Sequence, residues 1–72
     1  MFKVVERKTD GNTTSKHEYE LNDVKDIWDL IVGITGDRTE AKRAMLIAAN
    51  MRWDDEFYSG VYNSYYIECI RK

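Results

Sequence analysis

The stretch from Asp37 to Arg52 constrains the fold of this chain more than any other. Asp37 and Glu40 fit a capping-box start, because their carboxylates can accept from backbone N–H groups that the first helical turn leaves unpaired. Small and apolar residues recur at helical steps of three and four, namely Ala41, Ala44, Met45, Ala48 and Met51. The sequence therefore predicts a helix here, with an alanine-rich face onto which other elements pack closely.

A second amphipathic segment precedes this helix. It starts at about Val24, after a cap at Asn22 or Asp23, and its apolar positions share one face. Gly33 is expected to end it, since glycine readily adopts the left-handed conformation found just past a helix. The short link that follows predicts that the two helices pack as a hairpin.

Two N-terminal segments, 2–8 and 13–21, predict an antiparallel β-hairpin. Between them, Asp10-Gly11 fits a two-residue turn, because such turns need positive φ angles that these residues tolerate. The turn would set three pairs opposite one another: Phe2 and Tyr19, Val4 and His17, and the oppositely charged Lys3 and Glu18.

Beyond Arg52, Asp54 is expected to cap a short turn that ends at Ser59-Gly60, and residues 61–71 predict a final strand. The order β-β-α-α-β predicts a small α+β fold that forms a single domain over residues 1–72. In it, the N-terminal antiparallel hairpin and the C-terminal strand form a three-stranded sheet with both helices on one face. The final strand could lie beside the first strand and parallel to it, or beside the second strand.

Size and charge limit the classes of protein to consider. Seventy-two residues are near the lower limit for a domain that folds alone. With 11 basic and 13 acidic residues, the chain lacks the basic excess of a duplex-DNA binder. Its single cysteine, Cys69, cannot form an internal disulfide, which suits a reducing cytoplasm. No apolar run is long enough to cross a membrane, so no membrane partner is expected.

No catalytic, cofactor or metal site is expected. One histidine and one cysteine cannot supply a zinc site of the usual spacing. Neither a phosphate-binding loop nor a nucleophile elbow is present. We therefore expect a non-enzymatic protein that acts by binding.

An aromatic and acidic segment, 53–62, is the main candidate binding surface. Interfaces favour Tyr and Trp as buried anchors, and acids beside them could complement a basic partner surface. A protein of this kind could be an inhibitor or accessory factor of the sort that phages and other mobile elements encode. The alternative is that Trp53 and Phe57 close the core while the acids are merely solvated. The residues expected to bind a protein partner are Trp53, Asp54, Asp55, Glu56, Phe57, Tyr58, Tyr62 and Tyr66.

The link Gly33-Ile34-Thr35-Gly36 resembles the G-x-x-G loop of KH domains, and the strand–helix–loop–helix–strand order around it is similar too. The resemblance implies a clamp on single-stranded nucleic acid. It is confined to the loop and the element order: Ile34 and Thr35 are not basic, and the acidic Asp37 follows. A glycine-ended helix followed by a capped one explains the same residues.

A nucleic-acid-binding role is therefore the alternative function. One version uses the loop with nearby basic residues: Gly33, Gly36, Arg38, Lys42 and Arg43. The other uses Lys3, Arg7 and Lys16 beside Tyr66 on a sheet face, because basic and aromatic side chains together can track a single strand. A homodimer formed through sheet faces or edges is a third hypothesis.

Overall fold

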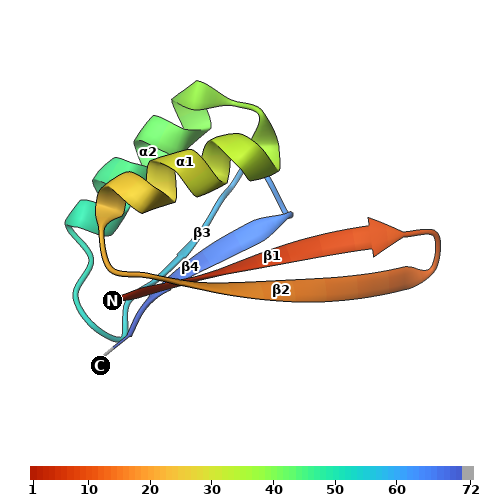
Figure 1. The fold of residues 1–72 in the computed structure, drawn as a ribbon, viewed down its shortest axis with the longest axis horizontal. Helices are drawn as coiled ribbons and strands as arrows, with labels where there is room; N and C mark the ends of the chain where they lie inside the picture. Colours follow the sequence, from red (N-terminus) through yellow and green to blue (C-terminus); the bar gives the residue numbers. More distant parts are fainter. Residues whose placement is uncertain (71–72) are drawn as a thin grey trace.

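The computed structural model, which describes residues 1–70, places two helices over one face of a four-stranded sheet (Figure 1). The elements are β1 (Phe2–Asp10), β2 (Thr13–Leu21), α1 (Val24–Thr35), α2 (Arg38–Ala49), β3 (Glu56–Tyr58) and β4 (Tyr65–Cys69). The predicted α+β class, with both helices on one face, is confirmed. The sheet has four strands where three were predicted.

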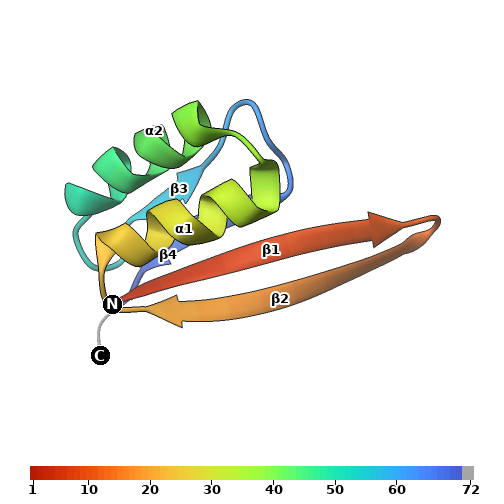
Figure 2. The ribbon, with the colours of Figure 1, turned by 45° about the horizontal axis from the view of Figure 1, so that its top comes forward.

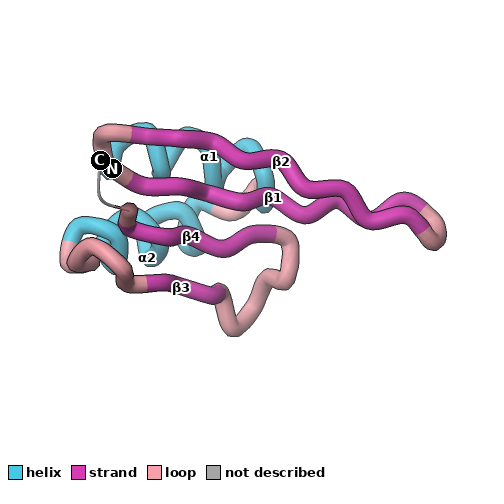
Figure 3. The backbone as a smooth tube through the Cα atoms, turned by 90° about the horizontal axis from the view of Figure 1, so that it is seen from below, coloured by secondary structure: helices cyan, strands magenta, loops and turns pink. Residues whose placement is uncertain are grey.

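The additional strand is β3, in the segment predicted to form a capped turn. It pairs antiparallel with β4, so the strand order is β2-β1-β4-β3, as Figure 3 shows. Because the chain reverses between β3 and β4, β4 runs antiparallel to β1. The predicted placement beside the first strand is therefore right in its neighbour but wrong in its parallel direction, and the alternative placement beside the second strand is wrong. The predicted strand 61–71 also extends past the described residues, and Arg71 lies outside them.

The hairpin is confirmed, but its predicted register is wrong by two residues. Asp10 pairs with Thr13, so the two turn residues are Gly11 and Asn12. Gly11 has a φ of +61° and Asn12 has no positive φ, the pattern of a type II′ turn. A shift of two residues keeps every side chain on its predicted face. The observed partners of Val4 and Lys3 are Tyr19 and Glu20.

The first helix runs past its predicted end. Asp23 caps its start by accepting from the Lys25 N–H, and Gly36 ends it with a φ of +68°. The Gly36 N–H donates to the Val32 carbonyl, and the Thr35 hydroxyl donates to the Ile31 carbonyl at 2.7 Å. Gly33 is thus inside the helix, and the resemblance to a KH-type G-x-x-G loop does not extend to the structure.

Asp37 caps α2 as predicted, since its Oδ1 accepts from the N–H groups of Thr39 and Glu40. Glu40 does not return this bond as a capping box would. Its side chain is 4% exposed and turns toward the sheet. The helix ends at Ala49, three residues before the predicted limit of Arg52, and Asn50 caps it.

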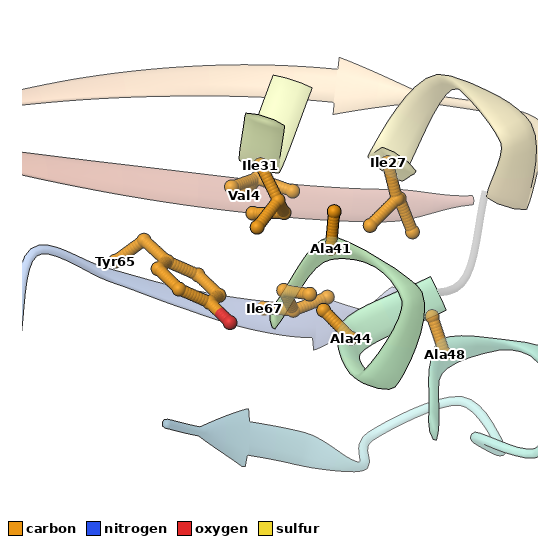
Figure 4. Packing of buried hydrophobic residues seen from close by; sticks show 8 residues of the cluster. All are labelled: Val4, Ile27, Ile31, Ala41, Ala44, Ala48, Tyr65 and Ile67. Carbon is orange, nitrogen blue, oxygen red and sulfur yellow. The ribbon is translucent and has the colours of Figure 1, made fainter. Parts of the chain in front are cut away.

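The core lies between the helices and the covered sheet face. Figure 4 shows its members from four elements: Val4, Ile27, Ile31, Ala41, Ala44, Ala48, Tyr65 and Ile67. Three alanines supply the contribution of α2, which lets that helix pack close to α1, as its alanine-rich face predicted. Met45 and Met51, predicted on the same face, are only partly buried.

The hairpin extends beyond the rest of the molecule (Figures 1 and 2). β4 pairs with β1 only from Phe2 to Glu6, whereas β1 and β2 pair to their turn. We call residues 7–16 the arm. All its side chains are exposed, and it is a two-stranded ribbon without a helix above it. Neither helix described for residues 1–70 is long and apolar enough to cross a membrane.

Candidate functional site

The sheet face opposite the helices is open. The pairing places there the predicted Lys3, Arg7, Lys16 and Tyr66, together with Val5, Glu18, Glu20, Glu56, Tyr58 and Glu68. Three basic residues are thus interleaved with four carboxylates on this face. The face therefore has the charge of a mixed surface rather than that of a basic one.

Two stacked tyrosines occupy the centre and edge of this face. Tyr58 on β3 lies opposite Tyr66 on β4, with ring centroids 5.1 Å apart and an interplanar angle of 26°. The guanidinium carbon of Arg7 lies 5.2 Å from the Tyr66 centroid, so the row continues onto β1. Val5, on the same face, is only 1% exposed, which shows that neighbouring side chains pack over it.

Tyr58 is held in place but remains accessible. It is 57% exposed, and its hydroxyl donates to Glu56 Oε2 at 3.0 Å. The hydrogen bond to the Glu56 carboxylate, with partial desolvation, raises the pKa of the Tyr58 phenol. A fixed ring that still exposes one face to solvent can act as a ready-made contact for a partner.

Carboxylates gather beside the tyrosines. Glu56 and Glu68 are direct cross-strand partners, an arrangement that like charges normally destabilise. Lys3 offsets part of this repulsion, because its Nζ lies 3.9 Å from Glu68 Oε2. The same Nζ lies 3.9 Å from Glu18 Oε1.

Two further acids extend this cluster beyond β3. The backbone holds them in place: Asp54 N–H donates to the Cys69 carbonyl at 2.7 Å, and Cys69 N–H donates to the Asp55 carbonyl at 2.9 Å. Asp54 adopts a φ of +75°, which aspartate tolerates. A hollow of about 100 Å³ is lined by Asp54, Asp55, Glu56 and Glu68, with Cys69 and Ile70. We call Tyr58, Tyr66, Asp54, Asp55, Glu56 and Glu68 the aromatic–acidic face.

Other members of the predicted binding segment lie elsewhere. Phe57 packs against the core, and Arg43 lies 5.4 Å from its ring centroid. Tyr62 is partly buried and donates its hydroxyl to Asp37 Oδ2 at 2.8 Å. Trp53 lies in the turn before β3 and is 52% exposed. Five of the eight predicted residues thus share the aromatic–acidic face, while Phe57 and Tyr62 lie on the helix side.

A buried polar cluster fixes the loop before β4, and the sequence did not predict it. The Tyr65 hydroxyl donates to Glu40 Oε2, and Arg43 Nε lies 3.3 Å from Glu40 Oε1. Burial, followed by the hydrogen bond and charge of Glu40, raises the pKa of the Tyr65 phenol. Ser59 Oγ accepts from the N–H groups of Val61 and Tyr62. These bonds are structural, since the Tyr65 hydroxyl ties the start of β4 to α2 and Ser59 holds the turn within the loop.

The structure does not gather the residues of the nucleic-acid alternative. Gly33 is helical, and Arg43 is occupied by Glu40 and Phe57. Arg38 and Lys42 are exposed on α2, on the opposite side of the sheet from the open face. Lys3, Arg7 and Lys16 do share the open face, but among the carboxylates described above.

A groove beside the acids was also missed. It has a volume of about 450 Å³ and is lined by Leu46, Ile47, Asn50, Met51, Asp55 and Glu56. Leu46 is 51% exposed. The run Met45-Leu46-Ile47 could have signalled it, because three consecutive apolar residues in a helix cannot all face the core.

Comparisons of the chain with protein-family models, with curated proteins and with solved structures found no match.

Proposed function

We propose that this protein is a non-enzymatic protein-interaction module whose working surface is the aromatic–acidic face. The observation that carries the proposal is the Tyr58–Tyr66 stack on an open sheet face, 5.1 Å between centroids, beside four carboxylates. Its buried, unpaired cysteine suits a reducing compartment such as the cytoplasm.

The chemistry of this face favours a partner that presents arginine or lysine. Arg7 already illustrates the fit within the molecule, because its guanidinium lies 5.2 Å from the Tyr66 ring centroid. An incoming cation could lie against the accessible ring of Tyr58 in the same way. Neighbouring carboxylates would pair with a second cation, and the groove at Leu46 would receive an apolar side chain of the partner.

The proposed mechanism is occlusion of the partner. The face is supported by the sheet and by the buried Val5, so little ordering is needed when it binds. A partner whose basic site is covered in this way would be inhibited. An inhibitor or accessory factor of a mobile element is one setting for such a protein.

Affinity capture with Tyr58→Ala tests the proposal. Loss of a central aromatic anchor should weaken capture of the partner by roughly 30-fold, the effect of about 2 kcal/mol at an interface hot spot. Val61→Ala is the control, because Val61 is 73% exposed but lies outside the face. Circular dichroism should show that both variants are folded. Equal capture by wild type and Tyr58→Ala would contradict the proposal.

The nucleic-acid alternative rests on the same stacked rings, which could also hold bases. Its carboxylate neighbours oppose it, because they would repel the phosphates. Capture repeated after nuclease treatment separates the two functions. A partner that nuclease removes, with affinity that falls steeply as salt rises, would favour nucleic acid.

A further inference from the structure

Among residues 1–70, no strand pairs with the backbone groups on the outer edge of β2. β2 is the first strand in the order β2-β1-β4-β3 and pairs with β1 alone, over all nine of its residues. It contains no proline and no break in its pairing, two devices that often protect such an edge; its charged residues, Lys16, Glu18 and Glu20, are a third device and restrict which strand can pair there. The edge is therefore competent to pair with another strand.

The arm would be stabilised by a strand that pairs with this edge. Beyond Glu6 the sheet narrows to the two strands of the hairpin, and a two-stranded ribbon is marginal in water without further support. A third strand along β2 would support the arm over its whole length. Within residues 1–70, the loop before β4 touches only the base of the arm, where Arg7 N–H donates to the Ser64 carbonyl at 2.7 Å, and Figure 2 shows the outer part of the arm extending alone.

We propose that β2 pairs with β2 of a second copy of this chain, antiparallel about a two-fold axis at His17. The turn of the hairpin directs Thr13 N–H toward Asp10, and the antiparallel ladder alternates from there. Thr14, Lys16, Glu18 and Glu20 then direct their N–H and carbonyl groups outward. Only a register that sets these even-numbered residues opposite one another can form the bonds between copies.

Charge selects one register among these. With His17 at the axis, Lys16 of each copy faces Glu18 of the other, which gives two opposite-charge pairs on the open face. A two-residue shift of one copy in one direction sets Lys16 against Lys16. A shift in the other direction sets Glu18 against Glu18. Both side chains are exposed, and Glu18, which lies 3.9 Å from Lys3 Nζ in its own copy, still has 63% of its side chain open to a second cation.

The second copy fits better than an unrelated strand because the edge is complementary to itself. The two-fold register also matches Thr13 with Leu21 and Ser15 with Tyr19, small residues against larger ones on the helix side. No like charges face each other in it. The resulting sheet would be continuous through both copies, with the arm of each lying along the body of the other.

Light scattering over about a hundredfold range of concentration tests this inference. Wild type should approach twice the chain mass of 8.5 kDa as concentration rises. Lys16→Glu and Glu18→Lys should each weaken dimerisation roughly 10- to 100-fold, because two attractive pairs become repulsive. The double variant Lys16→Glu/Glu18→Lys restores both pairs in reverse and should dimerise again.

Lys8→Glu is the matched control, since it makes the same charge change in the arm but lies on β1. It should leave the dimer intact. Far-UV circular dichroism confirms the fold of each variant, and Lys16→Gln serves as a milder variant if Lys16→Glu unfolds. A wild type that stays monomeric overturns the inference. A dimer that both single swaps leave unchanged also overturns it.

Discussion

Tyr65 and Glu40 form a buried pair whose role depends on protonation. The phenol donates to the carboxylate while Tyr65 is 2% exposed, so neither group has water as a substitute partner. Arg43 offsets the charge of Glu40 from the helix side. The cost of burying the carboxylate is therefore met by two partners.

Removing the phenol should lower stability. Tyr65→Phe leaves Glu40 with one partner fewer, and we expect a loss of about 1–3 kcal/mol in the free energy of unfolding at neutral pH. Urea denaturation measures it. The raised pKa of Tyr65 adds a pH dependence: the folded chain holds this proton to a higher pH than the unfolded chain does. Its contribution is complete below about pH 10 and falls as the pH rises further.

The rate at which stability falls with rising alkaline pH distinguishes the Tyr65–Glu40 pair from the other tyrosines. Hydrogen bonds to carboxylates also raise the pKa values of Tyr19, Tyr58 and Tyr62, so the variant should keep part of the slope. Wild type should lose stability above about pH 10 more steeply than Tyr65→Phe. Identical slopes would show that Tyr65 does not hold its proton in the way described.

Among the elements, α1 runs past its expected end at Gly33, and two glycines test this. A Cβ at Gly33 or at Gly36 would meet no described atom within 4 Å beyond the adjacent backbone, so the backbone conformation decides the effect of each substitution. Gly33 is helical, and Gly33→Ala should raise stability by about 0.5–1 kcal/mol. Gly36 has a φ of +68°, and Gly36→Ala should lower the free energy of unfolding by about 1–2 kcal/mol.

Thermal or urea unfolding of the two variants gives the comparison. The two substitutions should change the free energy of unfolding in opposite directions. Alanine at position 33 only reduces the backbone freedom of the unfolded chain, whereas alanine at position 36 is strained in the folded chain. A destabilising Gly33→Ala would instead favour a loop that begins at Gly33, as the sequence alone suggested.

The sequence predicted elements better than it predicted their ends and partners. Alternation correctly placed Lys3, Arg7, Lys16 and Tyr66 on one sheet face, because side chains alternate between faces along a strand. The residues Asp10, Gly11 and Asn12 allow turns at two positions, so the hairpin register was not determined. β3, with three residues, is too short to show any period.

The candidate site was predictable in part for the same reason. Tyr58, Tyr66 and the acids from Asp54 to Glu56 were identified by composition. They lie beside Glu68 because β3 pairs with β4. No local sequence pattern predicts that pairing. Glu40 is at the capping-box position in the sequence, but in the structure its side chain is buried and accepts a hydrogen bond from the Tyr65 hydroxyl instead.

At the scale of the whole molecule, the two proposed surfaces lie at opposite edges of the sheet. The aromatic–acidic face is at β3 and β4, whereas the second copy would pair with β2. In the two-fold register, the open sheet faces of both copies lie on the same side of the dimer. A dimer would therefore present two aromatic–acidic faces on one side, an arrangement that can bind a two-site partner more tightly than one copy does.

The central claim is that the acids at β3 and β4 serve binding rather than folding. Glu56 tests it best, because its charge faces that of Glu68. Glu56→Gln removes this repulsion and keeps an oxygen to accept from the Tyr58 hydroxyl, so stability should rise by about 0.2–1 kcal/mol. Glu20→Gln is the control. Glu20 lies opposite Lys3, so removing its charge relieves no repulsion and should not raise stability.

The decisive measurement is the affinity of Glu56→Gln for the partner that wild type captures. The account predicts that this affinity falls by about tenfold, the effect of 1.4 kcal/mol, although the variant is at least as stable as wild type. An affinity equal to that of wild type and of Glu20→Gln would contradict it, because the carboxylates would then contribute nothing to recognition.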